Sequence, residues 1–124
     1  MIYDFSPDES AFLNMQSSGT LRLIEKQNIL DSILKYQSQN IKIKKHQEST
    51  NKIHFAALDN LLQVTDFRKD PPQFNGNNQQ LQTYINNKIL ESGLTGTSII
   101  FLEQQLKTAT NLTALLKKEY NLDD

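Results

Sequence analysis

Residues 28–66 contain neither proline nor glycine, and this uninterrupted stretch constrains the fold more than any other feature of the sequence. Proline cannot continue a helix and glycine weakens one, so nothing here prevents a single very long helix. Apolar residues recur at helical spacing near both ends of the stretch, at Leu30, Ile33, Leu34 and Ile41 and again at Phe55, Leu58, Leu61 and Leu62. No alternating, strand-like pattern is longer than residues 42–44, so the sequence predicts an all-α fold.

The middle of this stretch, residues 37–52, is polar, with Ile41 and Ile43 as its apolar residues. Two arrangements fit this composition. Either one long helix projects beyond the rest of a bundle, or the helix breaks between Ser49 and Asn51, where Ser, Thr and Asn would cap a second segment well. We favour two helical segments in near-continuity and keep a single helix over residues 28–66 as the alternative.

The N-terminal sequence Ser6-Pro7-Asp8-Glu9 has the pattern of a capping box, in which two side chains accept hydrogen bonds from free backbone N–H groups at a helix start. It predicts a short helix that ends near Gly19, with this glycine in the left-handed conformation. The next apolar residues, Leu21, Leu23 and Ile24, are expected to pack the following turn into the bundle.

Two further helices are expected in the second half of the chain. Prolines at residues 71–72 end the long stretch, and a polar loop follows. The next helix is predicted over residues 78–91, with a turn at residues 92–96 that contains two glycines. A last helix starts near Thr97 or Ser98, and its apolar seam is predicted at Ile99, Leu102, Leu106, Ala109, Leu112, Leu116 and Tyr120. We therefore expect a helical hairpin or small bundle of about four helices, with residues 1–124 as a single domain.

Composition excludes several classes of function. The 124-residue chain has no cysteine, a formal charge of −1 and 37% hydrophobic residues. A disulfide scaffold, a thiolate zinc site and a cysteine nucleophile are therefore impossible. No apolar run approaches the ~18 residues of a membrane span, and the N-terminus lacks the apolar region of a signal peptide. The length suits one domain with a real but thin core.

No residues form a recognisable catalytic, cofactor-binding or metal-binding pattern. His46 and His54 are eight residues apart in the sequence, too far apart along one straight helix to share a small metal ion. We interpret both as surface histidines. Asp59 and Asp66 lie beside apolar residues, as expected on the solvent side of an amphipathic helix. The sequence thus predicts that the protein is not an enzyme and uses no cofactor.

Residues 35–52 carry five lysines and one glutamate, a local excess of positive charge. This segment could bind phosphates or anionic lipid headgroups. It has no arginine, however, and Tyr36 is its one aromatic residue. The segment therefore has few side chains that could stack on bases or make bidentate contacts with them. We therefore expect a solvated helix face and no nucleic-acid partner.

A family resemblance is carried by residues 10–24, Ser-Ala-Phe-Leu-Asn-Met-Gln-Ser-Ser-Gly-Thr-Leu-Arg-Leu-Ile. The order of an aromatic residue, Leu or Met, Ser-Ser-Gly and Leu-x-Leu-Ile resembles the signature of an uncharacterised family of small Bacteroidetes envelope proteins. Residues 29–36 approximate the apolar and aromatic run that follows in that family. Residues 112–120, which end in Leu-Leu-Lys-Lys-Glu-Tyr, resemble its closing helix.

The resemblance implies a periplasmic or membrane-anchored location, because members of that family typically carry one N-terminal transmembrane helix before a helical region outside the cytoplasm. This sequence lacks such a helix. We therefore expect a piece cut after the anchor, a processed piece or a divergent soluble relative, with any membrane attachment through an anchor absent from this chain. The family has no assigned activity, so no catalytic residue is carried over.

Two functions remain open from the sequence. The first is a non-enzymatic structural or protein-interaction module of the bacterial cell envelope, which binds a protein partner or itself through helical surfaces. The alternative is an extracytoplasmic ligand-sensing helical bundle that binds a small molecule between its helices. That alternative requires convergent polar groups, such as Tyr84 or Tyr120 beside Arg22.

Overall fold

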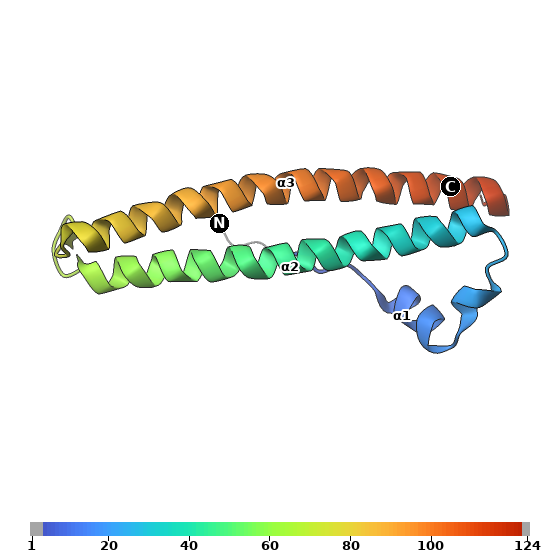
Figure 1. The fold of residues 1–124 in the computed structure, drawn as a ribbon, viewed down its shortest axis with the longest axis horizontal. Helices are drawn as coiled ribbons and strands as arrows, with labels where there is room; N and C mark the ends of the chain where they lie inside the picture. Colours follow the sequence, from blue (N-terminus) through green and yellow to red (C-terminus); the bar gives the residue numbers. More distant parts are fainter. Residues whose placement is uncertain (1–3, 123–124) are drawn as a thin grey trace. The chain divides into compact units, whose positions relative to one another are not determined.

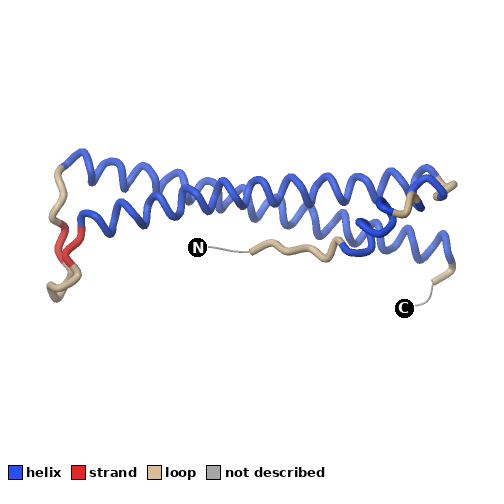
Figure 2. The backbone as a smooth tube through the Cα atoms, turned by 90° about the horizontal axis from the view of Figure 1, so that it is seen from below, coloured by secondary structure: helices blue, strands red, loops and turns tan. Residues whose placement is uncertain are grey.

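The structure, a computed structural model, describes residues 4–122 and is almost entirely helical, which confirms the all-α class. Its longest elements are the helices α2 and α3, which run antiparallel to each other (Figures 1 and 2). In chain order the elements are α1 (Ser10–Ser17), the 3-10 turn η1 (Thr20–Leu23), α2 (Gln27–Val64), β1 (Thr65–Asp66), β2 (Gln73–Phe74) and α3 (Asn78–Tyr120).

The chain forms two compact units, and both long helices contribute to each of them. Among the described residues, the loop unit comprises Lys45–Ile99 together with Asp4, and it includes the connection between the two helices. The arm unit comprises Phe5–Lys44 and residues 100–122, and it includes α1. Within each unit, a part of α2 packs beside a part of α3.

Helix α2 is continuous, so the expected break between Ser49 and Asn51 is wrong. Residues that would cap a new helix instead bond back into the existing one. The Ser49 hydroxyl donates to the Lys45 carbonyl at 3.2 Å, and the Thr50 hydroxyl donates to the His46 carbonyl at 2.9 Å. Because Thr50 is completely buried, packing against α3 holds this turn in the helical conformation.

Helix α3 is also continuous, which overturns the predicted turn at residues 92–96 and reduces the expected four helices to three among the described residues. The prediction gave too much weight to Gly93 and Gly96. A glycine inside a helix costs about 1 kcal/mol relative to alanine, which the long pairing with α2 easily offsets, and no proline follows to end the helix.

Replacing Gly93 and Gly96 with alanine is expected to raise the free energy of unfolding by about 0.5–1 kcal/mol for each substitution. A Cβ atom at either position meets no other atom within 4 Å, and neither glycine has a positive φ. Thermal unfolding of the two single variants and of the double variant measures the effect. A lower melting temperature for either variant would contradict the prediction.

The true capping box lies at the start of α3. The Asn77 side chain accepts a hydrogen bond from the Gln80 backbone N–H at 2.9 Å, and the Gln80 side chain accepts one from the Asn77 N–H at 2.8 Å. The capping box predicted at residues 6–9 is wrong, because α1 begins at Ser10 and its N-cap residue, Glu9, makes no side-chain cap. Asp8 instead accepts from the backbone and hydroxyl of Ser10.

The end of α1 was predicted correctly. The helix ends at Ser17, and Gly19 follows with a φ of 74°, the left-handed conformation that glycine adopts without steric penalty. The following turn differs from the prediction, since Leu23 is largely exposed whereas Leu21 and Ile24 are half-buried.

The connection between the long helices contains a short antiparallel pair that the sequence pattern did not indicate. Thr65 pairs with Phe74 and Asp66 pairs with Gln73. The Asp66 carboxylate accepts hydrogen bonds from the backbone and side chain of Arg68, which closes the loop locally. Asp66 therefore lies in this loop and not on the solvent side of a helix.

The two long helices bury a repeating set of positions, here called the seam. The seam residues of each helix follow one another at alternating spacings of three and four, the seven-residue repeat of a coiled coil. In α2 they are Ile29, Ile33, Tyr36, Asn40, Ile43, Gln47, Thr50, His54, Ala57, Leu61 and Val64. In α3 they are Tyr84, Asn87, Glu91, Leu94, Ser98, Phe101, Gln105, Thr108, Leu112, Leu115 and Glu119.

The seam is unusually polar. Every fully buried residue in the described part of the chain is a seam residue, and polar ones outnumber apolar ones: Asn40, Thr50, Glu91, Ser98 and Gln105 against Ile29, Ile43, Ala57 and Val64. The apolar seam predicted for α3 is therefore misplaced by one residue, except at Leu112, which does belong to the seam. Three of its members, Ile99, Leu106 and Tyr120, are more than half exposed.

Candidate functional site

A charged cluster occupies the seam of the loop unit. Glu91 of α3 is 3% exposed, and its two carboxylate oxygens accept hydrogen bonds from His54 Nδ1 of α2 at 2.6 Å and from Lys88 Nζ at 2.8 Å. The Lys88 ammonium and the His54 ring lower the pKa of Glu91 to about 2. Glu91 is therefore ionised and serves as a buried acceptor that joins the two helices.

Neither histidine is a freely solvated surface residue, contrary to the prediction. His54 is bound to Glu91, and its ring meets the Phe55 ring edge-on. His46 Nε2 donates to the Leu94 carbonyl of α3 at 2.9 Å. Both rings are half-buried and both act as links between helices. The structure thus uses the two histidines for helix pairing.

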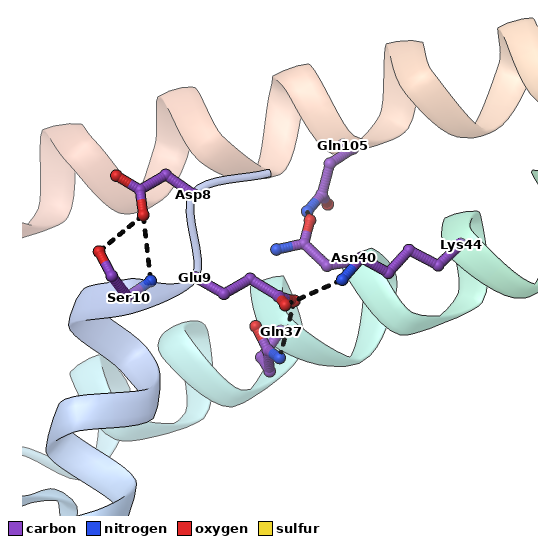
Figure 3. Close-up of polar contacts among 7 residues, drawn as sticks. All are labelled: Asp8, Glu9, Ser10, Gln37, Asn40, Lys44 and Gln105. Carbon is purple, nitrogen blue, oxygen red and sulfur yellow. Dashed lines mark hydrogen bonds and ion pairs between the residues drawn. The ribbon is translucent and has the colours of Figure 1, made fainter. Parts of the chain in front are cut away.

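The arm unit has a neutral counterpart of this cluster. The side chains of Gln105 and Asn40 lie against each other (Figure 3), and the Gln105 amide donates to the Asn40 side-chain oxygen. The same amide donates to the Tyr36 carbonyl at 3.1 Å. Asn40 is fully buried and Gln105 is 5% exposed. Within residues 4–122, the Asn40 amide nitrogen and the Gln105 oxygen have no hydrogen-bond partner. This pair therefore fixes the register of the helices at the expense of stability.

In the same unit, residues 5–26, here called the arm, are tied to the long helices through charge. The Glu9 carboxylate accepts from Lys44 at 3.0 Å and from Gln37 at 3.1 Å (Figure 3), and these two contacts lower its pKa. At the other end of the arm, Lys26 contacts Glu119 at 2.5 Å and lies over the Tyr120 ring.

The position that follows each seam residue defines one side of the helix pair. Each step of one residue along a helix turns the side-chain direction by 100° about the helix axis. In two antiparallel helices that face each other, the residues that follow the seam residues therefore point to the same side of the pair. In the loop unit, exposed apolar residues on this side include Ile99 and, nearer the connection, a group here called the apolar patch: Phe55, Leu58, Leu62, Leu81 and Ile85. Leu81 belongs to this side because it lies seven residues before Lys88, which follows the seam residue Asn87. A small hollow lined by both Leu58 and Lys88 confirms that the flanks of the two helices adjoin there.

The opposite side of the loop unit is polar. It consists of the positions that precede the seam residues, and Asn60, Gln63 and Thr83 line a hollow of about 160 Å³ there. Exposed apolar residues are thus not scattered evenly around the loop unit. Most of those in the two helices lie on one side. The exceptions are Leu90, on the polar side, and Ile89, which lies away from the seam.

In the arm unit, the side formed by positions that follow seam residues is partly covered by the arm. Gln37 and Lys44, which bind Glu9 of the arm, both follow seam residues of α2. Within the arm unit, the arm therefore lies over the side formed by positions that follow seam residues. Exposed Leu34, Ile41 and Leu106 belong to this side as well, so the arm covers it incompletely.

The polar groups suggested for ligand binding have other contacts. Tyr84 lines the small hollow beside His54 in the loop unit. In the arm unit, the Arg22 guanidinium lies against Gly19, and the Tyr120 ring faces Lys26. A hollow of about 310 Å³ between the helices of the arm unit is instead lined by Ser32, Lys35, Thr108, Asn111, Leu112 and Leu115.

The lysines of residues 35–52 do not gather on one face. Lys44 binds the arm, whereas Lys42 lies over the Phe101 ring at 4.2 Å on the opposite side of the pair. Lys35 also lies on that opposite side, where it lines the hollow of the arm unit. The positive charge is therefore distributed around α2.

Comparisons with protein-family models, curated proteins and solved structures found no match. Among the described residues, no helix is long and apolar enough to cross a membrane. The same residues contain no group of three potential metal-binding side chains close enough to hold an ion.

Proposed function

We propose that the chain is a non-enzymatic protein-interaction module whose helices form a complete bundle only when another polypeptide packs against them. The observation that carries this proposal is the inverted distribution of side chains. Polar residues fill much of the seam, while large apolar residues such as Phe55, Leu62 and Leu106 are more than half exposed. Groups of exposed large apolar residues within one unit, such as Phe55 and Leu62, mark interaction sites.

The amount of exposed surface supports the proposal. The chain exposes 8896 Å², whereas a compact monomer of 14.3 kDa is expected to expose about 6,800 Å². The excess is about 2,000 Å², which is more than the ~800 Å² that each partner buries in a standard stable interface. One partner helix pair could remove this excess.

The proposed setting is the bacterial cell envelope. This part of the proposal is supported by the resemblance of residues 10–24 and 112–120 to the Bacteroidetes envelope family, with any membrane attachment through a segment outside this chain. Fractionation of cells that carry the native gene tests it directly. Recovery of the protein with the cytoplasmic fraction would contradict the envelope setting and leave the interaction function open.

Affinity capture from gently solubilised native membranes, followed by mass spectrometry, tests the interaction function. We expect stoichiometric recovery of a polypeptide, either a second copy or another protein, with the native chain. The same capture with Leu62→Glu is expected to lose it, whereas Leu90→Glu, on the polar side of the loop unit, retains it. A chain that remains monomeric and recovers nothing would contradict the proposal.

A second candidate function is the binding of a small molecule in the arm unit. The hollow of about 310 Å³ there is at the lower end of the size range of ligand pockets, and Ser32, Lys35 and Asn111 supply polar groups. A thermal-shift screen tests it. A ligand whose stabilising effect disappears in Asn111→Leu would favour this function, and the absence of any stabilising compound would count against it.

A further inference from the structure

We infer that the apolar patch of the loop unit is a self-association surface that docks on the same patch of a second copy and forms an antiparallel four-helix bundle. This inference rests on the proposed function and identifies the partner and the face. The patch consists of Phe55, Leu58, Leu62, Leu81 and Ile85, and their side chains are between 39% and 55% exposed.

The absence of charge within the patch suits a pairing of identical surfaces. In a two-fold symmetric interface each patch faces its own copy, so any charge at its centre would face an identical charge. All five patch residues are uncharged, as is Asn51, one turn before Phe55. Lys88 follows the seam residue Asn87 and therefore lies on the same side as the patch, one turn from Ile85. Its ammonium group is bound by the Glu91 carboxylate at 2.8 Å, which neutralises its charge.

The spacing of the patch residues fits helices as the occupant. Phe55 and Leu62 are seven residues apart, the same repeat as the seam residues Ala57 and Val64 beside them. A seven-residue apolar repeat keeps contact with another helix through a left-handed supercoil. A second helix pair with the same repeat therefore follows the patch along its length, as in four-helix bundles.

A two-fold axis parallel to the helices brings the patch residues of both α2 and α3 into contact with the second copy. Because this axis keeps each residue at its level along the helices, it places Leu58 and Leu62 in α2 of one copy over Ile85 and Leu81 in α3 of the other. Phe55 directly follows His54, which contacts Glu91, so it meets the partner's α3 about one turn beyond Ile85. The contact between α2 and the partner's α3 is then antiparallel, as it is between α2 and α3 within one chain. All four helices of the bundle thus pair in the same way.

The second copy is assigned to the loop unit because the two units differ in what covers the side formed by positions that follow seam residues. In the arm unit, the corresponding side is partly occupied by the arm, which Glu9 attaches to Gln37 and Lys44. In the loop unit, large apolar residues on that side remain exposed in the described chain. Burial of these residues against a second copy removes part of the excess of about 2,000 Å², and a standard stable interface needs ~800 Å² from each partner.

Sedimentation equilibrium of the full chain tests the inference. We expect the wild type to have twice the chain mass at about 10 µM, and Leu62→Glu to weaken the association about 100-fold because a charge would be buried in the centre of the interface. Leu90→Glu is the matched control, since Leu90 is similarly exposed but lies on the polar side. Unchanged helical circular dichroism shows that both variants fold.

Cysteine cross-linking tests the orientation, because the native chain contains no cysteine. A mixture of Leu62→Cys and Ile85→Cys chains is expected to form a disulfide-linked heterodimer on oxidation, at a higher yield than Leu90→Cys mixed with Leu62→Cys. Equal yields in the two mixtures would overturn the proposed arrangement.

The two proposals can fail separately. A wild-type chain that is monomeric at about 100 µM overturns self-association, whatever else it binds. If that monomer still captures a different protein and loses it on Leu62→Glu, the interaction function stands with another partner. Equal weakening of the dimer by Leu62→Glu and Leu90→Glu would overturn the assignment of the face.

Discussion

Replacing Asn40 with leucine is expected to lower the free energy of unfolding by about 2 kcal/mol, even though leucine favours helices and is more apolar. The loss comes from Gln105, whose buried amide donates to the Asn40 oxygen. Without Asn40, the 5% exposed Gln105 side chain loses this acceptor and keeps only the Tyr36 carbonyl. A buried polar group without its partner is more costly than the net value of the hydrogen bond.

The double variant Asn40→Leu/Gln105→Leu is expected to recover this loss and to be at least as stable as the wild type. It removes both amides together with the two atoms that lack partners, Asn40 Nδ2 and Gln105 Oε1. Urea denaturation of the wild type, both single variants and the double variant, at one protein concentration, gives the coupling energy. Gln104→Leu, at the exposed neighbouring position, is the control. A double variant less stable than both single variants would contradict the prediction.

The helices themselves could be predicted from the sequence, because periodicity and helix-end signals depend on local interactions. The left-handed Gly19 and the start of the helix near Asn78 were both predicted. The predicted breaks near Ser49 and at Gly93 failed for a non-local reason. Pairing with a neighbouring helix over many turns outweighs the weak preference of a few residues for caps or turns.

The buried side of each helix could not be predicted by assuming that apolar residues lie inside. Ile99, Leu102 and Leu106 do follow helical spacing, but they mark a side about 100° from the seam. The line of buried residues instead passes through Glu91, Ser98 and Gln105, which are polar.

The polar clusters were missed because their members are far apart in the sequence. His54 and Glu91 are 37 residues apart, and Asn40 and Gln105 are 65 residues apart. The register of the two helices brings them together, and nothing local reveals that register. Glu9 was likewise assigned to a helix cap, although its contact with Lys44 depends on how the arm folds back on α2.

Replacing Glu91 with glutamine is expected to lower stability at neutral pH and to remove part of the acid sensitivity of the protein. The pKa of Glu91 in the folded protein is about 2, against a usual value of 4.5. A carboxyl group with a lowered pKa contributes its stability above pH 4.5, and this contribution is lost as the pH falls toward 2. The shift corresponds to at most about 3 kcal/mol, and solvent around the half-exposed Lys88 reduces this to about 2 kcal/mol.

The difference between the stability curves of the wild type and Glu91→Gln isolates this contribution. Other carboxylates with lowered pKa values, such as Glu9 and Asp66, are present in both proteins and cancel. The difference is expected to be constant above about pH 5 and to shrink by about 2 kcal/mol between pH 4.5 and pH 2. Glu103→Gln, at an exposed position of α3, is the control and should leave the curve unchanged. A difference independent of pH would show that the bonds from His54 and Lys88 do not favour the ionised form of Glu91, and the charged link between α2 and α3 would then be structural packing without an electrostatic contribution.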